Sequence, residues 1–301
     1  MAFNAWDHQP PPSTHLAYAE TQYALQRSSP VSSFDAHRFN SNPSRWWDLF
    51  YTHNTTNFFK DRKWLHQEFP ILAEMTHRDA GKKIILEIGA GAGNTAFPIL
   101  AANENEELSV FACDFSKRAV ELIQRHEAYD GQRIRASVWD VADEEMSRPE
   151  GVDEGTVDIV LMIFIFSALS PAQWARAVQN IWGCLKVGGT VLFRDYGRGD
   201  LAQVRFKKGR YLEENFYVRG DGTRVYFFEI DELKEIWGGT AQEEGIGFEV
   251  VDLEVDRRML VNRKRELKMY RCWLQGRFRK VDDGESNLSA EKVLDFDGRN
   301  L

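Results

Sequence analysis

The sequence predicts an α/β fold with a mostly parallel sheet, and three observations support this prediction. Short apolar runs alternate with segments that can form helices. The first run, residues 84–88, leads directly into glycines at alternating positions, Gly89, Gly91 and Gly93. The next two runs each end at an acid, Asp114 and Asp140. A buried strand, a glycine loop and a following helix are typical of the first unit of a nucleotide-type site.

The expected elements follow one another regularly along the chain. One helix is expected to begin near Asn94, and a second runs from the N-cap Ser116 to about residue 124. A third begins at Pro171, reaches about residue 185 and is closed by the pair Gly188-Gly189. With right-handed crossovers, the result is a seven-stranded sheet with one reversed strand, flanked by helices. The expected strands are residues 84–88, 108–113, 134–138, 157–164, 190–193, 248–255 and 269–274.

Composition divides the chain into segments. Residues 1–34 are rich in Pro, Ser, Gln and His, and we expect a disordered or loosely attached tail there. Residues 35–80 are expected to form a helical segment over the site. Residues 81–280 form the α/β domain, and residues 281–301 form an acidic flexible tail. An insertion at 195–228 follows the fifth strand and contains a hairpin signal, Gly220-Asp221-Gly222.

The distribution of charge along the chain restricts which kinds of molecule the protein can bind. The formal net charge of −8 by itself argues against a nucleic acid partner. However, residues 257–280 hold a single acid, Glu266, among many arginines and lysines, which favours a basic face on an acidic protein. The three cysteines lie far apart, so we expect reduced buried thiols and no metal site. We find no membrane-spanning run and no signal peptide, and expect a cytoplasmic or nuclear protein.

Two segments have a structural and a functional interpretation. Residues 43–69 are dense in aromatic side chains interleaved with Arg and Lys. They either pack as an amphipathic helix on the sheet, or cover a cofactor and bind bases and phosphates. The cations of the 195–228 insertion are either solvated or contact RNA.

The pattern E-x-G-x-G-x-G, which begins at Glu87, resembles motif I of class I S-adenosylmethionine-dependent methyltransferases. Asp114 has the spacing expected of a ribose-binding acid. Longer blocks resemble one family more closely, the tRNA N3-methylcytidine methyltransferases, and the resemblance extends over roughly residues 34–280. These blocks are residues 58–70, 86–100, 112–116, 193–209 and 214–228.

The resemblance implies a Rossmann-like methyltransferase that uses S-adenosylmethionine, releases S-adenosylhomocysteine and methylates N3 of cytidine at tRNA position 32. Some relatives act with seryl-tRNA synthetase or another recruiting protein. Relatives often have Cys at the position of Ala90 and Val at that of Ala92, both small changes. The alternatives are a methyltransferase of proteins or small molecules, and a non-catalytic tRNA-binding partner.

The site residues are assigned by role. In-line attack by N3 needs no prior deprotonation, and Asp195 is the candidate catalytic carboxylate for the cationic product. Its structural interpretation is a helix cap or a partner of Arg194 or Arg198. The cofactor candidates are Trp47, Tyr51, Glu87, Gly89, Gly91, Gly93, Asp114, Asp140 and Ile163. The tRNA candidates are Phe58, Phe59, Lys60, Arg62, Arg194, Lys207, Lys208, Arg210, Arg219 and Arg224.

Overall fold

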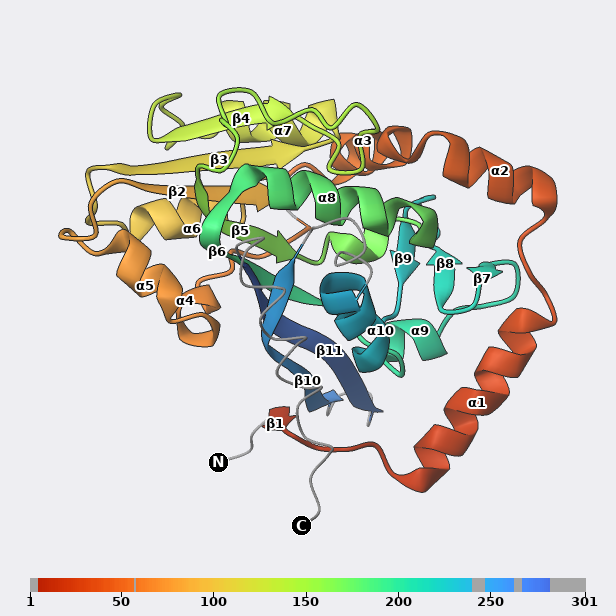
Figure 1. Cartoon of the computed structure of the whole chain (residues 1–301). Coiled ribbons are helices and arrows are strands. Elements are labelled where there is room, and N and C mark those ends of the chain that lie inside the picture. The colour runs from red at the N-terminus through yellow and green to blue at the C-terminus, as the bar shows by residue number, and fades with distance from the viewer. Residues whose placement is uncertain (1–4, 57, 240–246, 263–266, 282–301) are drawn as a thin grey trace, which may run out of the picture.

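A computed structural model of the chain describes residues 5–56, 58–239, 247–262 and 267–281. Its centre is an eight-stranded sheet with the order β1-β10-β11-β6-β5-β2-β3-β4 (Figure 1). The strands are β1 (Ala5–Asp7), β2 (Lys83–Ile88), β3 (Leu108–Asp114), β4 (Ile134–Val138), β5 (Val157–Ile163), β6 (Leu185–Tyr196), β10 (Phe248–Asn262) and β11 (Leu267–Lys280). The seven predicted strands are all present, and β1 adds an eighth at the edge.

The strand directions agree with the predicted topology. Strands β2 to β6 pair in parallel, and β11 pairs antiparallel with β6. Strand β10 pairs antiparallel with β11, so β11 is the reversed strand of the predicted seven. The parallel strands therefore all end at one edge of the sheet, where their loops can build a site.

Helices cover both faces of the sheet, because its central strands are apolar on both sides. In β5 the side chains of Ile159, Leu161 and Ile163 belong to one core, and those of Val160 and Met162 belong to the other. Helices α4 to α7 pack on the first face, and α8 and α10 pack on the second (Figure 1). These helices are α4 (Leu65–Glu68), α5 (Ile71–Thr76), α6 (Ala96–Ala101), α7 (Lys117–Gln124), α8 (Trp174–Cys184) and α10 (Ile230–Lys234).

The helix predicted from Pro171 to about Leu185 ends where expected, but the glycine pair does not close it. The segment begins with a short 3-10 turn, η2 (Pro171–Gln173), and α8 ends at Cys184. Gly188 and Gly189 lie inside β6 instead of closing the helix. A Cβ at Gly189 would stand 2.9 Å from the backbone oxygens of Lys186 and Val157, so glycine permits this close approach.

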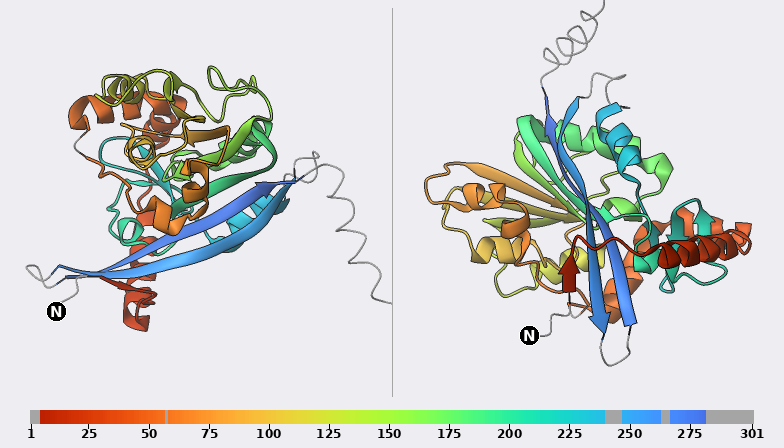
Figure 2. Two further views of the ribbon diagram at one scale, coloured as in Figure 1. Left: turned by 90° about the vertical axis from the view of Figure 1, so that its left-hand side faces the viewer. Right: turned by 90° about the horizontal axis from the view of Figure 1, so that it is seen from below.

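Strands β10 and β11 are longer than predicted and form a hairpin that extends past the helical layers (Figure 2). On one face of this hairpin, acids of β10 lie opposite arginines of β11, as with Asp252 and Arg277. This cross-strand pairing of opposite charges stabilises the hairpin where β11 also pairs with β6.

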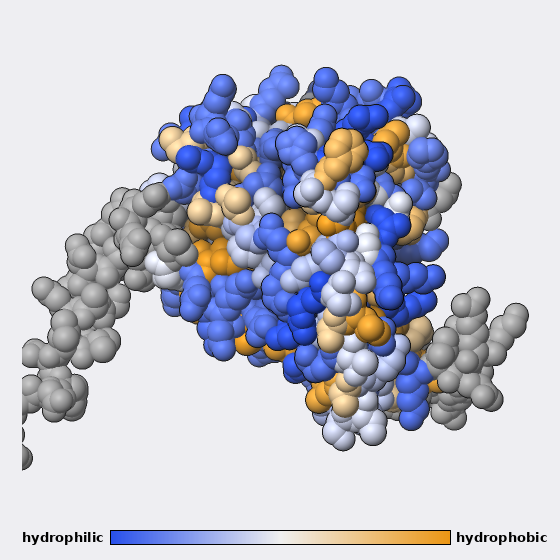
Figure 3. Space-filling view, turned by 90° about the vertical axis from the view of Figure 1, so that its right-hand side faces the viewer, coloured by the Kyte–Doolittle hydropathy of each residue, from blue (hydrophilic) through white to orange (hydrophobic). Residues whose placement is uncertain are grey.

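The predicted disorder of residues 1–34 is wrong for most of that segment. Strand β1 pairs with β10, and helix α1 (Ser13–Arg27) packs against the short helix α9 (Leu201–Val204). Helices α2 (Ser33–Ser41) and α3 (Pro43–Asn54) follow. On this side of the molecule, apolar residues form small separate patches among hydrophilic ones (Figure 3). The predicted acidic tail, beyond Val281, lies outside the described residues.

The insertion forms a small sheet of its own, with β7 (Tyr211–Glu213), β8 (Phe216–Val218) and β9 (Arg224–Tyr226) in sequential order. The predicted hairpin is the β8–β9 pair, with Gly220-Asp221-Gly222 in its turn. The turn is closed by the backbone N–H of Arg219, which donates to the carbonyl of Thr223 at 2.7 Å.

Buried polar contacts hold α1 in place. The side-chain amide of Gln26 donates to the carbonyls of Gln203 and Phe206, each at 3.0 Å, and its oxygen accepts from Tyr217 Oη at 2.9 Å. Gln26 is 2% exposed. Removing the Gln26 side chain would leave two buried carbonyls and a tyrosine hydroxyl without this partner. The free energy lost by leaving buried polar groups unpaired exceeds the net stabilisation that a hydrogen bond normally gives.

We therefore expect Gln26→Ala to lower the free energy of unfolding by about 1–3 kcal/mol. The matched control is Gln22→Ala, the same change at a half-buried position of α1 with no described side-chain hydrogen bond. Urea titration of both variants measures the difference. If both variants lost the same small amount of unfolding free energy, the result would contradict an ordered α1.

Candidate active site

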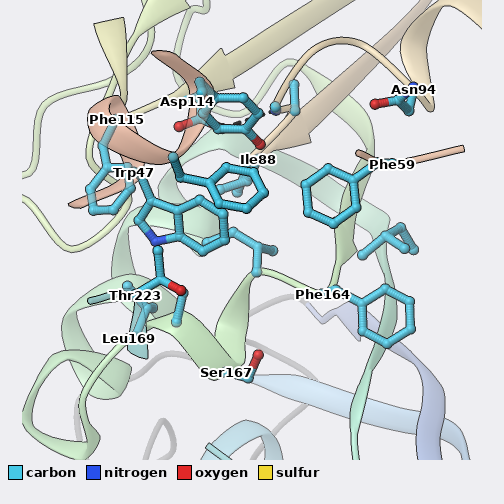
Figure 4. Close-up of a pocket in the computed structure, with 18 of the residues that line it drawn as sticks. Trp47, Phe59, Ile88, Asn94, Asp114, Phe115, Phe164, Ser167, Leu169 and Thr223 are labelled. Atoms are coloured by element: carbon cyan, nitrogen blue, oxygen red, sulfur yellow. Dashed lines mark hydrogen bonds between the residues drawn. The ribbon is translucent and has the colours of Figure 1, made fainter. Parts of the chain in front are cut away.

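A pocket lies at the carboxyl ends of β2, β3, β5 and β6. Its volume is about 1140 Å³, including the part that opens to solvent. Open α/β sheets bind ligands at this edge. Trp47 and Phe115 reach into the cavity on one side, and Phe59 and Phe164 do so on the other (Figure 4).

The glycine loop after β2 forms the floor of the pocket. Gly89, Gly91 and Gly93 have φ angles of +66°, +58° and +84°, a region that glycine adopts without strain. A Cβ at Gly91 would overlap Tyr51 Oη, and one at Gly89 would overlap the side chain of Ile165. Glycine at these positions therefore lets α3 and the loop after β5 close on the glycine loop.

Asp114 joins the glycine loop to the end of β3. Its carboxylate accepts from the backbone N–H groups of Gly91 and Ser116, each at 2.9 Å. Burial raises its pKa to about 6, and the two backbone hydrogen bonds oppose this rise. Because it also lines the pocket, a carboxylate held in this way can accept hydrogen bonds from a ligand.

Helix α3 is fastened over the pocket by a contact that the sequence did not reveal. Ser116 caps α7 as predicted, accepting from the N–H of Ala119 at 3.2 Å. Its hydroxyl donates to Asp48 Oδ1 at 2.7 Å. Asp48 stands between Trp47 and Tyr51 in α3, and both of these line the pocket. The only sequence signal was an acid inside the aromatic segment.

Glu87 and Arg62 lie together beneath the glycine loop. Glu87 is 0% exposed, and its nearest described cationic atom is Arg62 Nη1, at 3.7 Å. Burial raises the pKa of Glu87 to about 7, and the charge of Arg62 opposes the rise. Arg62 lines the pocket and also donates to Thr95 Oγ1 at 2.8 Å.

The structure brings most predicted cofactor residues together. Glu87 and Gly93 are not among the described residues that line the pocket. Asp140 follows β4, and its Oδ1 accepts from the backbone N–H of Ala142 at 2.9 Å. Ile163 ends β5. The predicted residues that line the pocket are Trp47, Tyr51, Gly89, Gly91, Asp114, Asp140 and Ile163.

Asp195 lies behind the pocket wall, 0% exposed, and is not among the described lining residues. Its two oxygens accept from the backbone N–H groups of Ser167, at 2.9 Å, and Tyr196, at 2.8 Å. Both of those residues line the pocket. Burial raises the pKa of Asp195 to about 6, and hydrogen bonds from Ser167 oppose this rise. The catalytic role of Asp195 stays a prediction.

The aromatic tRNA candidates are accessible. Phe58 is 58% exposed, and Phe58 and Phe59 both line the pocket. Their ring centroids are 4.9 Å apart in an edge-to-face arrangement. Together they present apolar surface at the pocket entrance.

Two of the arginines predicted to bind tRNA are buried instead, each 4% exposed. The guanidinium of Arg194 pairs with Asp256 and lies between the rings of Trp64 and Trp273, 5.2 and 5.0 Å from their centroids. Arg224 donates to Ala168 O at 3.1 Å, and burial lowers its pKa to about 10. Both arginines are engaged by the protein and are not presented to an RNA.

The other predicted cations differ in their partners. Lys60, Lys207 and Lys208 are exposed and have no ion pair within the described part of the chain. Arg219 lines the pocket, and Arg210 donates to the Arg219 carbonyl at 3.1 Å.

Among the described residues of the basic stretch 257–280, four arginines pair with acids that lie outside it. The ion pairs that involve it are Arg258–Glu68, Arg258–Asp256, Arg271–Asp200, Arg277–Asp252 and Arg279–Glu249. The stretch therefore offers fewer unpaired cations to an RNA than its composition suggested.

Several lining residues were not selected from the sequence. Phe164 and Tyr196 follow or end β5 and β6, and Asp221 and Thr223 lie in the β8–β9 turn. Only the position of Phe164 at a strand end could have drawn attention to it.

Two features are absent from the part of the chain that the structure describes. No group of three or more His, Cys, Asp or Glu side chains there could hold a metal ion. No helix among them is long and apolar enough to cross a membrane.

Comparison with known proteins identifies the fold and the family. A methyltransferase domain family matches residues 86–191. The structure of a Burkholderia thailandensis 1,6-didemethyltoxoflavin-N1-methyltransferase, with S-adenosylhomocysteine bound, aligns over 84% of this chain and 93% of that one, with a TM-score of 0.50 and 17% identity. The predicted fold class, a Rossmann-like methyltransferase sheet, is confirmed.

Two relatives are much closer in sequence. The chain is 47% identical over 277 residues to the tRNA N(3)-methylcytidine methyltransferase of Schizosaccharomyces pombe, covering 92% of this chain and 87% of that one. It is 53% identical over 276 residues to the tRNA(Thr) (cytosine(32)-N(3))-methyltransferase of Saccharomyces cerevisiae, covering 91% of this chain and 43% of that one. The chain thus spans less than half of this second relative. On these identities, it belongs to the tRNA N3-methylcytidine methyltransferase family.

Proposed function

We propose that the chain transfers a methyl group from S-adenosylmethionine to N3 of cytidine 32 in the anticodon loop of tRNA. The observation that carries the proposal is a pocket that unites the glycine loop, Asp114 and Asp140 with accessible aromatic side chains at its entrance. Membership of the family and the name of the Saccharomyces cerevisiae relative support the base and its position.

The residues of the pocket fit the cofactor. Gly89 and Gly91 line the cavity with backbone alone, and Asp114 and Asp140 reach the cavity from the ends of β3 and β4. Asp114 would accept from ribose hydroxyls, and Asp140 would accept from the adenine amine. Trp47 and Tyr51 would cover the bound cofactor. When bound, S-adenosylmethionine supplies a methyl group on a positively charged sulfonium.

The protein has little proton transfer to perform, because cytosine N3 carries a lone pair in the plane of the ring. Its main tasks are to hold the base in line with the methyl group and to exclude water. A base in a loop can be unstacked and turned outward at modest cost. Phe58 and Phe59 are suitable stacking faces at the entrance.

Asp195 would act from behind the pocket wall. Its charge could favour the cationic product base, and its hydrogen bonds hold Ser167 and Tyr196, which line the cavity. Within the described structure it touches the pocket only through these neighbours, so we propose a positioning and electrostatic role.

The exposed lysines Lys60, Lys207 and Lys208, with Arg62 and Arg219 in the pocket, would contact the phosphates of the anticodon arm. A recruiting protein, such as seryl-tRNA synthetase, would add contacts that this chain lacks. A cytoplasmic or nuclear location would match a tRNA substrate.

The direct test is incubation of the purified chain with labelled S-adenosylmethionine and total tRNA, with and without cell extract. Digestion to nucleosides then reveals 3-methylcytidine. Product from the protein alone supports the proposal, and product only with extract supports it with a required helper. Cofactor binding without 3-methylcytidine in either reaction would overturn it, and would favour another substrate or a non-catalytic partner.

The positioning role of Asp195 predicts a change in turnover. Asp195→Asn should lower kcat by about 100-fold while changing S-adenosylmethionine affinity little, because its contacts lie on the substrate side. Since its pKa is raised to about 6, the carboxylate becomes charged as the pH rises through 6. We expect wild-type kcat to increase over that range and the kcat of the variant to stay level.

The matched control is Asp158→Asn, at the opposite end of the sheet, where Asp158 pairs with Lys83 and Lys186. It should affect stability and leave the pH profile of kcat unchanged. Equal kcat values for Asp195→Asn and the wild type would contradict the proposed positioning and electrostatic role of Asp195.

Lysines that contact phosphates should contribute to the salt dependence of tRNA binding. Replacing Lys207 and Lys208 by Gln should weaken binding and reduce the slope of log K against log salt by about 1–2. The control, Lys82→Gln, changes an exposed lysine just before β2, at the edge away from the pocket. Filter binding at several salt concentrations measures the slopes. An unchanged slope in the double variant would show that these two lysines do not contact the tRNA phosphates.

A further inference from the structure

The proposed contacts to the ribose and the adenine of the cofactor lie in one half of the pocket. Asp114 and Asp140 lie at the ends of β3 and β4, on one side of β2 in the sheet order. The ends of β5 and β6, on the other side of β2, contribute Phe164 and Tyr196 to the same cavity. Neither aromatic residue has a role in the cofactor fit.

Phe164 has an unusual backbone. Its φ angle is +61°, in the left-handed region that bulky side chains rarely adopt. Such strain persists only where the surroundings impose it, and it is frequent at functional sites. Here it directs the ring of Phe164 into the cavity, opposite Trp47 and on the same side as Phe59 (Figure 4).

The surroundings hold this conformation from several sides. The backbone N–H of Phe164 donates to the Arg194 carbonyl at 2.8 Å. The Tyr196 ring packs on that of Phe164, with centroids 5.0 Å apart. The following residue, Ile165, lies against Gly89, so the segment abuts the glycine loop. The ring of Phe164 is therefore braced beside the loop that would hold the reactive end of the cofactor.

We propose that Phe164 presents its ring to the target cytosine and stabilises the positive charge that the base acquires. This inference rests on the proposed function. The N3 lone pair forms the new bond to the methyl carbon while the carbon–sulfur bond breaks and its electron pair stays on sulfur. Positive charge thus passes from sulfur to the base, and no proton is transferred.

An aromatic face suits this change of charge. The ring quadrupole attracts a cation over the face, most strongly where water is excluded. Asp195 is not among the described lining residues, whereas Phe164 is, so the ring can approach the base directly. The interaction is stronger with the cationic product-like base than with neutral cytosine, which is the condition for faster turnover.

The test is a series of variants in which Phe164 is replaced by mono-, di- and trifluorinated phenylalanine. Fluorine withdraws charge from the ring face and changes its shape little. We expect kcat for 3-methylcytidine formation to fall stepwise, by about tenfold over the series. Phe164→Leu should lower kcat at least as much, and S-adenosylmethionine affinity should stay within about twofold of the wild type.

The matched control is the same series at Phe166. This residue is two positions away in the same segment, 0% exposed in the core and outside the described pocket lining. Fluorination there should leave kcat without a stepwise trend. A second readout needs no turnover: the affinity for an anticodon stem-loop with 3-methylcytidine at position 32, relative to cytidine, should fall along the Phe164 series only.

The outcomes separate the two proposals. If the wild type forms no 3-methylcytidine, with or without extract, the proposed function fails and this inference fails with it. If the wild type forms the product while kcat and the affinity ratio stay level along the Phe164 series, only this inference is overturned.

Discussion

The site depends on one buried carboxylate and the two backbone N–H groups that it binds. Asp114 joins Gly91 of the glycine loop to Ser116 at the start of α7, and Ser116 in turn holds Asp48 of α3. A carboxylate 6% exposed is costly unless it is hydrogen-bonded, so the three segments must meet in this arrangement for it to be accommodated. The floor and the cover of the pocket are thereby linked through a single group.

The insertion completes the enclosure from the opposite side. Gly222, with φ of +87°, lies in the β8–β9 turn, and a Cβ there would overlap the ring of Trp46 in α3. The turn that contributes Arg219 and Thr223 to the pocket is therefore packed directly on the helix that covers it. Arg224 adds a second link, because it donates to Asn40 of α2 at 3.0 Å and to Gln173 at 3.0 Å. Three segments distant in sequence thus form one cavity.

The sequence predicted those features whose signals are local. Apolar runs located the parallel strands, and the glycines and Asp114 followed from spacing along the chain. Features set by distant partners escaped prediction. The composition of residues 1–34 indicated disorder, yet Gln26 is held by the carbonyls of Gln203 and Phe206. Arg194 looked like an RNA contact because its partner Asp256 lies far along the sequence. The left-handed backbone of Phe164 has no local signal, because its residue type disfavours it.

The link between Asp48 and Ser116 allows the central claim to be measured directly. Asp48→Ala removes the two hydrogen bonds that fasten α3, from Ser116 Oγ and from the backbone N–H of Arg118, and leaves the bonds between Asp114 and the glycine loop intact. Calorimetric titration with S-adenosylmethionine should show about 3- to 10-fold weaker binding, within the net worth of such hydrogen bonds. Asp35→Ala, on α2 and bonded to Ser32, should bind like the wild type. Wild-type affinity in Asp48→Ala would contradict a cofactor site covered by α3.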